Sequence, residues 1–561
     1  MRLKTSLVAG AVVGAVMLAG CGSGDSNTAS TPTGDAAAAT QGTAALTIAK
    51  PDGALATESN NPWVGDSSGL KLGYINAILE PLGVVNLIDP TKPTQPWLAS
   101  DIAWADDYKS VVLTARDGVK WNDGQAFSAA DIGFTFDLFM KHKELDTAAL
   151  GLKAVKVEGN KVTLTFANSM YVKQDKVLHK QIVPKHVWEK VADPAKEVNL
   201  KPVGTGPYTL SQFSTQSVEL TARNDYWGGT PAVPKLYYVS YNDNTALTTA
   251  LANGDADWAQ AFIPNVKSAY VDKDAEHNVY WAANGLGIDA MFVNTTTKPF
   301  NDVAFRKAIN MVVDREKHMA IAREGGVPAL TSVTGLPTPV GDSYIASAYQ
   351  GQNYSVDVEG AKKVLTDAGY TYSGDKLLDK EGAPVTFTLQ VPQGWNDYVT
   401  GISLIADEVK ALGVEAAVKT PDADTWWAAK GKGDFQAILH WTDTGATPYD
   451  LYSDIMDGRF LKPAGKEADF NFGRFDSPEA TAALNAYANA TSDDARKTAL
   501  DTVQKVFVEQ VPAMPVGTRP FIGSYNTRNY VGWPGEQDPY APADPTQPSA
   551  VLILTKLKPA S

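Results

Sequence analysis

The sequence predicts an α/β fold, with α+β as the alternative, and more than one lobe; three observations lead to this prediction. Between about residues 384 and 441, strand patterns alternate with a helix pattern, as is typical of βαβ units. Amphipathic helical stripes precede and follow that unit. The chain has 561 residues, enough for roughly three to four domains of about 150 residues each.

The βαβ unit begins with a predicted strand over 385–391, where apolar and polar residues alternate. A predicted helix follows over 402–412, because its apolar residues recur at helical spacing and stop at Gly413. Two further strands are predicted over 414–418 and 435–439. This order predicts a mainly parallel sheet with helices on its faces.

Two loops with aromatic residues follow strands of this unit. The first, 392–398, contains Trp395, and the second, 441–449, begins at Trp441 and contains Asp443. In parallel sheets, ligands bind outside the carboxyl ends of the strands. We therefore expect a binding site where these loops meet.

The remaining predicted elements support a chain of several parts. A first strand is expected over 45–48, and strands mix with one helix, 129–140, between 113 and 166. Helices with an apolar stripe or a clear stop signal are predicted over 305–312, 357–368 and 493–509.

The N-terminus reads as an export signal. A basic start is followed by an apolar run from Leu7 to Leu18, then by two small residues and Cys21, the one cysteine of the chain. The run is too short to span a bilayer. The ending resembles a bacterial lipobox, which implies a signal peptide over 1–21 and a lipid on Cys21; a plain signal peptide is the alternative. Residues 22–44 are small and polar, as in a flexible linker.

Composition excludes several functions. The net charge of −14 argues against a nucleic-acid partner, which requires clustered Lys and Arg. The six histidines are dispersed, so we expect no metal site and no cofactor. The pentapeptide 65–69 matches G-x-S-x-G, but a polar loop containing Pro62 precedes it in place of a strand, so no nucleophile elbow is expected. We predict no catalytic residues and no enzyme activity; an exported glycoside hydrolase stays open because carboxylates are numerous.

Several segments, read in order, resemble the family 5 extracellular solute-binding proteins of ABC importers. The matching pieces are YINAILEPL from Tyr74, LTARDGVKWNDGQAFSAADI from Leu113, PKHVW from Pro184, VGTGPY from Val203 and NDYWGG from Asn224. Together with the helix near Arg306 they cover almost the whole chain after the leader.

The resemblance implies a two-lobed type II periplasmic-binding-protein fold, in which lobe I carries an extra subdomain and ligand binds between the lobes. It implies a monomer that delivers a small molecule to ABC permease subunits outside the cytoplasm, anchored to the membrane by lipid. The implied boundaries are 45–72, 197–287 and 512–561 for lobe I, 73–196 for the extra subdomain, and 288–511 for lobe II. The chain would cross between lobes near 284–288 and 511–514.

Members of this family bind different ligands, and two classes stay open. Thirteen tryptophans favour a short, cellobiose-like oligosaccharide, because flat aromatic faces pack against sugar rings while amides and carboxylates bind hydroxyls. A peptide would instead place its α-amine on Asp443, although the segment WTDTGATPYD departs from the usual pattern of peptide binders. The predicted ligand-binding residues are Asn61, Trp63, Asn284, Trp395, Trp427, Trp441 and Asp443.

Overall fold

The computed structural model describes residues 41–51, 55 and 57–561. The predicted signal peptide, its lipidation site Cys21 and most of the predicted linker lie outside the described residues. Within the described chain, no helix is both long and apolar enough to cross a membrane.

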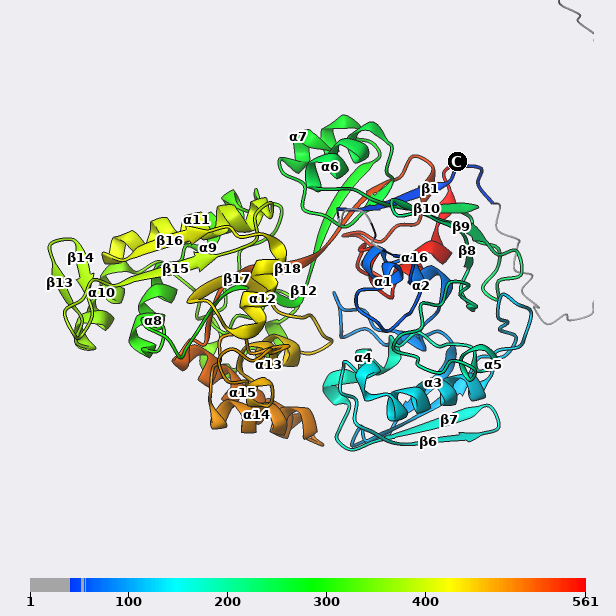
Figure 1. Cartoon of the computed structure of the whole chain (residues 1–561), viewed down its shortest axis with the longest axis horizontal. Helices are drawn as coiled ribbons and strands as arrows, with labels where there is room; N and C mark the ends of the chain where they lie inside the picture. The colour runs from blue at the N-terminus through cyan, green and yellow to red at the C-terminus, as the bar shows by residue number, and fades with distance from the viewer. Residues whose placement is uncertain (1–40, 52–54, 56) are drawn as a thin grey trace, which may run out of the picture. The chain divides into compact units, whose positions relative to one another are not determined.

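The largest sheet contains ten strands of the described chain, in the order β16-β15-β17-β12-β18-β11-β1-β10-β9-β8 (Figure 1). Its strands are β1 (Leu46–Lys50), β8 (Tyr208–Phe213), β9 (Ser217–Ala222), β10 (Lys235–Ser240), β11 (Trp258–Ala259), β12 (Asn278–Val293), β15 (Thr386–Gln390), β16 (Glu415–Lys419), β17 (Ala437–Trp441) and β18 (Ala513–Asn526).

The long strands β12 and β18 connect the two halves of this sheet. They pair antiparallel from Asn278–Asn526 to Phe292–Ala513, and the register shifts between Asn284 and Ile288. One end of the pair adjoins β11, and the other adjoins β17. The sheet as a whole is mixed, because these long antiparallel strands are inserted between two parallel parts. One parallel part is the βαβ unit, as expected, and the other consists of β1 with β10 and β11.

The βαβ unit forms as the periodicity indicates. β15 pairs in parallel with both β16 and β17. The intervening helix α11 (Asn396–Glu408) continues into a 3-10 turn that ends at Gly413, whose φ of 72° is left-handed. Glycine tolerates this conformation at no steric cost, which explains the stop signal.

A separate four-stranded antiparallel sheet, again counted over described residues, lies within the predicted subdomain. Its order is β4-β5-β7-β6, and helix α3 (Ala129–Lys141) packs on β6 and β7. Ser128 caps α3 in a capping box with Asp131, which satisfies otherwise unpaired N–H groups. The strands are β4 (Ala99–Trp104), β5 (Ser110–Ala115), β6 (Leu152–Glu158) and β7 (Lys161–Phe166).

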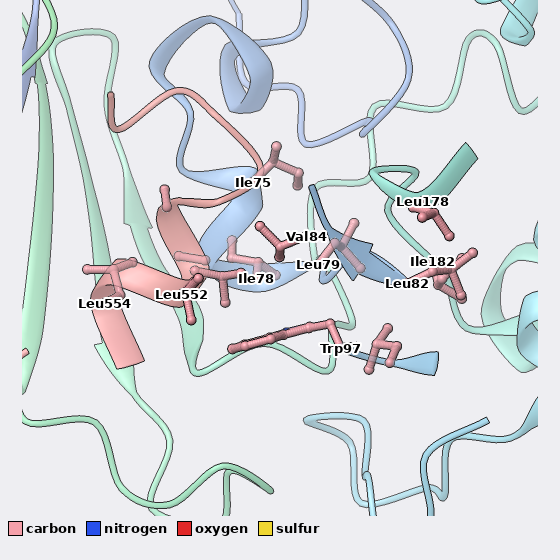
Figure 2. Close-up of a cluster of buried hydrophobic side chains, with 14 of the residues drawn as sticks. Ile75, Ile78, Leu79, Leu82, Val84, Trp97, Leu178, Ile182, Leu552 and Leu554 are labelled. Carbon is pink, nitrogen blue, oxygen red and sulfur yellow. The ribbon is translucent and has the colours of Figure 1, made fainter. Parts of the chain in front are cut away.

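Buried apolar side chains form distinct cores in the two lobes. One core joins residues before 259 to the C-terminal segment after 520, and two others lie almost entirely between 286 and 516. Figure 2 shows part of the first, where helix α2 (Ile75–Ile78) meets helix α16 (Ala550–Lys556) around Trp97. Each fully buried Leu or Ile side chain contributes about 1.5–3 kcal/mol, so each lobe has its own source of stability.

The other elements connect these layers. The remaining helices are α1 (Ser68–Leu72), α4 (Gln174–Leu178), α5 (Lys185–Trp188), α6 (Asn244–Asn253), α7 (Val266–Ala269), α8 (Val303–Val312), α9 (Arg315–Ile321), α10 (Val358–Asp367), α12 (Ala423–Lys432), α13 (Tyr449–Met456), α14 (Pro478–Asn489) and α15 (Asp493–Gln510). Short strand pairs are β2 (Gly83–Val84) with β3 (Gln95–Pro96), β13 (Thr371–Ser373) with β14 (Lys376–Leu378), and β19 (Tyr530–Val531) with β20 (Lys558–Pro559).

Candidate functional site

The two aromatic loops meet at one edge of the ten-stranded sheet. Trp395 follows β15 and precedes α11, whereas Trp441 is the last residue of β17. Because β15 and β17 are parallel neighbours, their carboxyl ends lie side by side. The ring centroids of Trp395 and Trp441 are 5.6 Å apart. The structure thus brings together two of the predicted ligand-binding residues.

Trp427 belongs to the same aromatic cluster. Its ring centroid lies 6.0 Å from those of Trp395 and Trp441, and the residue is 38% exposed. Its neighbour on α12, Trp426, is fully buried. Trp427 is therefore exposed, although it does not line the cavity beside Trp395 and Trp441, whereas Trp426 supports the cluster from the core.

A cavity of about 420 Å³, hereafter the tryptophan cavity, opens beside these rings. Trp395 and Trp441 line it from one lobe, and segments 50–51, 242–244 and 260–262 line it from the other. Its other lining residues are Arg323, Gln393, Gly394, Asp397, Tyr398, Arg519, Pro520 and Ile522. A molecule in this cavity would contact both lobes.

The wall of the tryptophan cavity is rich in hydrogen-bonding groups. Amide side chains come from Asn242, Asn244 and Gln260 on one side and from Gln393 on the other. Amides both donate and accept hydrogen bonds. Aromatic rings beside amides suit a ligand with apolar ring faces and hydroxyl groups.

A buried charge cluster underlies this cavity. The guanidinium of Arg323 donates to both Asp289 and Asp397. Burial alone would lower the pKa of Arg323, but these two carboxylates outweigh it and raise the pKa. The Tyr398 hydroxyl donates to Asp289 Oδ1 at 2.5 Å. The cluster fixes the loop after β15 to strand β12.

Trp441 is partly covered by protein groups. The His440 ring stacks on it at 4.2 Å and 16°, and the Arg519 guanidinium lies 4.0 Å from its ring centroid. A ligand that stacks on Trp441 would therefore have to share the ring with Arg519 or displace it. The sequence shows an arginine within the otherwise mostly apolar strand β18. It does not show that this arginine contacts Trp441.

Asp443 opens on a second cavity, of about 890 Å³, hereafter the aspartate cavity. Its walls come from the predicted subdomain, mainly segments 147–149 and 168–181, and from lobe II residues 443–470. The tryptophan and aspartate cavities thus lie on either side of the segment 441–444.

The electrostatics of the aspartate cavity are dominated by carboxylates around one lysine. Burial would lower the pKa of Lys176, but Asp450 and Asp175 outweigh it and raise the pKa. Lys176 Nζ lies 3.1 Å from Asp450 Oδ2 and 3.6 Å from Asp175 Oδ2. Asp443 is exposed to the cavity, yet the surrounding protein desolvates its carboxylate and raises its pKa, an effect that Lys176 opposes. Asp443 therefore already faces a cation of the protein.

Asn284 lies on β12 where the sheet crosses between lobes, close to the loop 441–449. The neighbouring Gly287 approaches this loop so closely that a Cβ there would lie 2.2 Å from Thr444 Oγ1. Among the described residues, no group donates a hydrogen bond to the buried Asn284 Oδ1. Asn284 thus has an unpaired acceptor, but it lines neither the tryptophan cavity nor the aspartate cavity.

Asn61 and Trp63 occupy the interior of lobe I, outside both cavities. Asn61 Nδ2 donates to the backbone oxygens of Pro194 and Glu197 at 2.9 and 2.8 Å. The Trp63 ring is 6% exposed and packs at 5.0 Å on Phe139 and on Trp188. Because Asn61 is fully buried and its side chain bonds to the backbone while Trp63 is part of the core, we leave both out of the proposed site.

The structure offers no metal centre in its described part, where no cluster of three or more His, Cys, Asp or Glu has a suitable arrangement.

The chain matches the family described as bacterial extracellular solute-binding proteins, family 5 Middle, over residues 94–459. This match spans more than half of the chain, and the protein belongs to that family. It is 26% identical to protein XP55 of Streptomyces lividans over 415 residues, 72% of each chain. It is also 25% identical to the oligopeptide-binding protein AppA of Bacillus subtilis, over 64% of this chain and 68% of AppA.

Solved structures share the two-lobed α/β fold. An oligopeptide-binding protein of an ABC transporter from Thermotoga maritima superposes with a TM-score of 0.81 and 23% identity, covering 92% of this chain and 99% of that chain. The same Thermotoga protein with mannohexaose bound gives a TM-score of 0.73 at 23% identity, covering 92% and 98%. At this identity the likeness establishes the fold.

Proposed function

We propose that this chain is the extracytoplasmic substrate-binding component of an ABC importer and that it captures a short, cellobiose-like oligosaccharide between its lobes. The main supporting observation is the tryptophan cavity, whose walls combine Trp395 and Trp441 from lobe II with amides from lobe I. Membership of a solute-binding family supports the transport role.

The proposed chemistry follows from the cavity wall. Sugar rings have apolar C–H faces that pack on indole rings, and their hydroxyls need both donors and acceptors. Trp395 and the uncovered part of Trp441 would supply the stacking area, and Trp427, which lies beside them outside the cavity lining, would extend it. Asn284 Oδ1 would accept a hydroxyl only if ligand binding uncovered it, and the aspartate cavity would take further units of a longer chain.

Capture by closure requires a ligand that favours the closed state. A solute held by both lobes stabilises the closed arrangement by its differential affinity for that arrangement over the open one. The permease subunits would then recognise the closed complex. In this role the protein performs no chemistry and acts as a monomer.

An oligopeptide is the second candidate ligand, and Asp443 is the observation that favours it. Its carboxylate opens on the larger cavity and is poorly hydrated, so an ammonium group would stabilise its charged form. Lys176 weakens this case, because it already compensates the acidic cluster. The relatives whose names mention peptides are the further support.

The proposed location rests on the N-terminal sequence. A lipid on Cys21 would tether the folded part through the linker 22–44, which keeps the protein at the membrane surface near its permease.

A ligand screen by thermal shift tests the proposal. Cello-, xylo- and manno-oligosaccharides are compared with di- to pentapeptides, because a ligand raises the melting temperature by mass action. We expect an oligosaccharide to give the largest shift and to remain intact after incubation. A shift with peptides alone would select the second candidate, and hydrolysis of the sugar would indicate a glycoside hydrolase.

A further inference from the structure

Asp289 lies behind the wall of the tryptophan cavity, bonded to the lining residues Arg323 and Tyr398, and both of its carboxylate oxygens are engaged. Oδ2 accepts from Arg323, and Oδ1 accepts from the Tyr398 hydroxyl. Arg323 also binds Asp397, so one guanidinium already serves both carboxylates. A second cation in this cluster is therefore not required to pair them.

Arg519 is that second cation. Its nearest approach to Asp289 Oδ1 is 3.6 Å, longer than a hydrogen bond. Within the described structure its guanidinium makes one side-chain hydrogen bond, from Nη1 to the Tyr398 hydroxyl at 3.1 Å. A guanidinium has five N–H donors, so most of the donors of Arg519 remain available.

The surroundings hold this guanidinium at the cavity wall. Arg519 lines the tryptophan cavity and its side chain is 32% exposed. The Trp441 ring lies 4.0 Å from it, a contact that orients the planar group by cation–π attraction. Its free edge is thus presented where a ligand would bind.

We propose that Arg519 recognises a carboxylate of the ligand in the tryptophan cavity, an inference that rests on the proposed function. The rigid fork of a guanidinium matches the two oxygens of a carboxylate, and such paired charge-assisted bonds are stronger than bonds to neutral hydroxyls. Arg323 is not suited to this role, because its charge is already compensated by the two aspartates and its side chain is only 10% exposed.

Two kinds of ligand carry the required carboxylate. In an oligosaccharide it is the C6 carboxylate of a uronic acid unit, and in a peptide it is the C-terminus. The shared chemistry is a carboxylate on a short chain, and matched probes separate the two sources.

The experiment measures the affinity of the mature protein for two probe pairs by titration calorimetry at low salt. One pair is cellobiose and cellobiouronic acid, which differ by a C6 carboxylate. The other is trialanine and its C-terminal amide. We expect the acid member of one pair to bind at least about tenfold more tightly than the neutral member, which corresponds to about 1.4 kcal/mol, and we expect added salt to reduce this preference.

Variants assign the preference to Arg519. In R519Q the ratio of acid to neutral affinity should fall to about one, and in R519K, which keeps the charge without the fork, the acid should retain part of its advantage. R528Q removes an equal charge at Arg528, which pairs with Asp274 and lies outside the cavity lining, and should leave the preference unchanged.

The outcomes are distinct. Neutral probes that bind as well as their acids in the wild-type protein overturn the carboxylate inference alone, as does a preference that persists in R519Q. Failure of all four probes to bind overturns the inference together with the proposed function.

Discussion

Lys176 and Asp450 form an ion pair of 3.1 Å that joins two parts of the chain distant in sequence. Lys176 belongs to helix α4 of the predicted subdomain, and Asp450 belongs to helix α13 of lobe II. The Asp450 side chain is 12% exposed and that of Lys176 is 31% exposed. This pair bridges the aspartate cavity and holds its two walls together.

Replacing Lys176 by Met should loosen this contact. Asp450 would then be a poorly hydrated carboxylate next to Asp443 without its cation, which costs about 2–3 kcal/mol. We expect a larger radius in small-angle scattering and a lower unfolding free energy. The double variant K176M/D450N should recover part of the loss, as a double-mutant cycle requires for a direct pair; strictly additive losses would show that the two residues do not interact.

Replacing Trp395 by Ala should weaken ligand binding more than it weakens the fold. Removal of one stacking face is expected to raise the Kd of the bound oligosaccharide by about 5- to 150-fold, the equivalent of about 1–3 kcal/mol for an aromatic anchor. Titration calorimetry and thermal unfolding measure the two effects.

The matched control for Trp395 is Trp426→Ala. Trp426 is fully buried against the same cluster, so its loss should cost about 3–5 kcal/mol of stability. If W395A unfolds the protein as readily as W426A and does not selectively reduce binding, Trp395 is a core residue.

The aspartate in the second cavity distinguishes the two ligand classes. D443N should reduce the affinity for a peptide ammonium by at least tenfold and should change oligosaccharide binding by less than about threefold, since a hydrogen bond to a charged group contributes more than one to a hydroxyl. Because burial raises the pKa of Asp443, peptide affinity should fall as pH falls through that raised pKa. If peptide affinity changes neither in D443N nor with pH, Asp443 does not bind the α-amine of the peptide.

The βαβ unit and its neighbouring loops could be predicted from sequence because their patterns are local. The strand before Trp395 and the strand before Trp441 each have a clear period, and parallel pairing then requires their ends to meet. Asn61 could not be assigned in this way. Its polar loop resembles a binding loop. Only the fold shows that the Asn61 amide donates hydrogen bonds to the backbone oxygens of Pro194 and Glu197, more than 130 residues away.

Arg519 could not be singled out from the sequence for a different reason. The role proposed for it depends on Asp289, Tyr398 and Trp441, which come from three other segments of the chain. No local period or motif marks such a cluster. Sequence patterns therefore predict the meeting of Trp395 and Trp441 at the strand ends, but they do not predict polar clusters that depend on tertiary contacts.

The N-terminal prediction can be tested independently of the fold. Cys21→Ser should abolish lipid attachment, so the protein should leave the detergent phase in phase partitioning and appear in the medium or as an unprocessed precursor. Cys21→Ala serves as a second substitution. Unchanged partitioning of both variants would show that Cys21 carries no anchor.

Glu80 is a buried carboxylate that organises the lobe I core. It is fully buried, and it accepts hydrogen bonds from Trp97 Nε1 at 2.7 Å, Tyr226 OH at 2.6 Å and Trp227 Nε1 at 3.0 Å. E80A leaves three donors without an acceptor, of which those of Trp97 and Tyr226 are buried, and should cost about 3–5 kcal/mol of unfolding free energy. E80Q should cost less, about 1–2 kcal/mol, because its oxygen still accepts while its amide nitrogen meets a donor.

The pH dependence of these variants provides the further test. Burial raises the pKa of Glu80 above its ordinary value of 4.5, although its hydrogen bonds oppose the shift. The folded state therefore binds a proton more tightly than the unfolded state, and the contribution of Glu80 to stability is lost as pH rises through the raised pKa. The stability difference between wild type and E80Q should then shrink as pH rises above 4.5.

The control E479Q alters a carboxylate that is 57% exposed and 3.5 Å from Lys505, and it should change stability by less than about 0.5 kcal/mol at every pH. If the unfolding free energy of the wild type relative to E80Q increases with pH, the fold stabilises Glu80 as the carboxylate rather than as the acid.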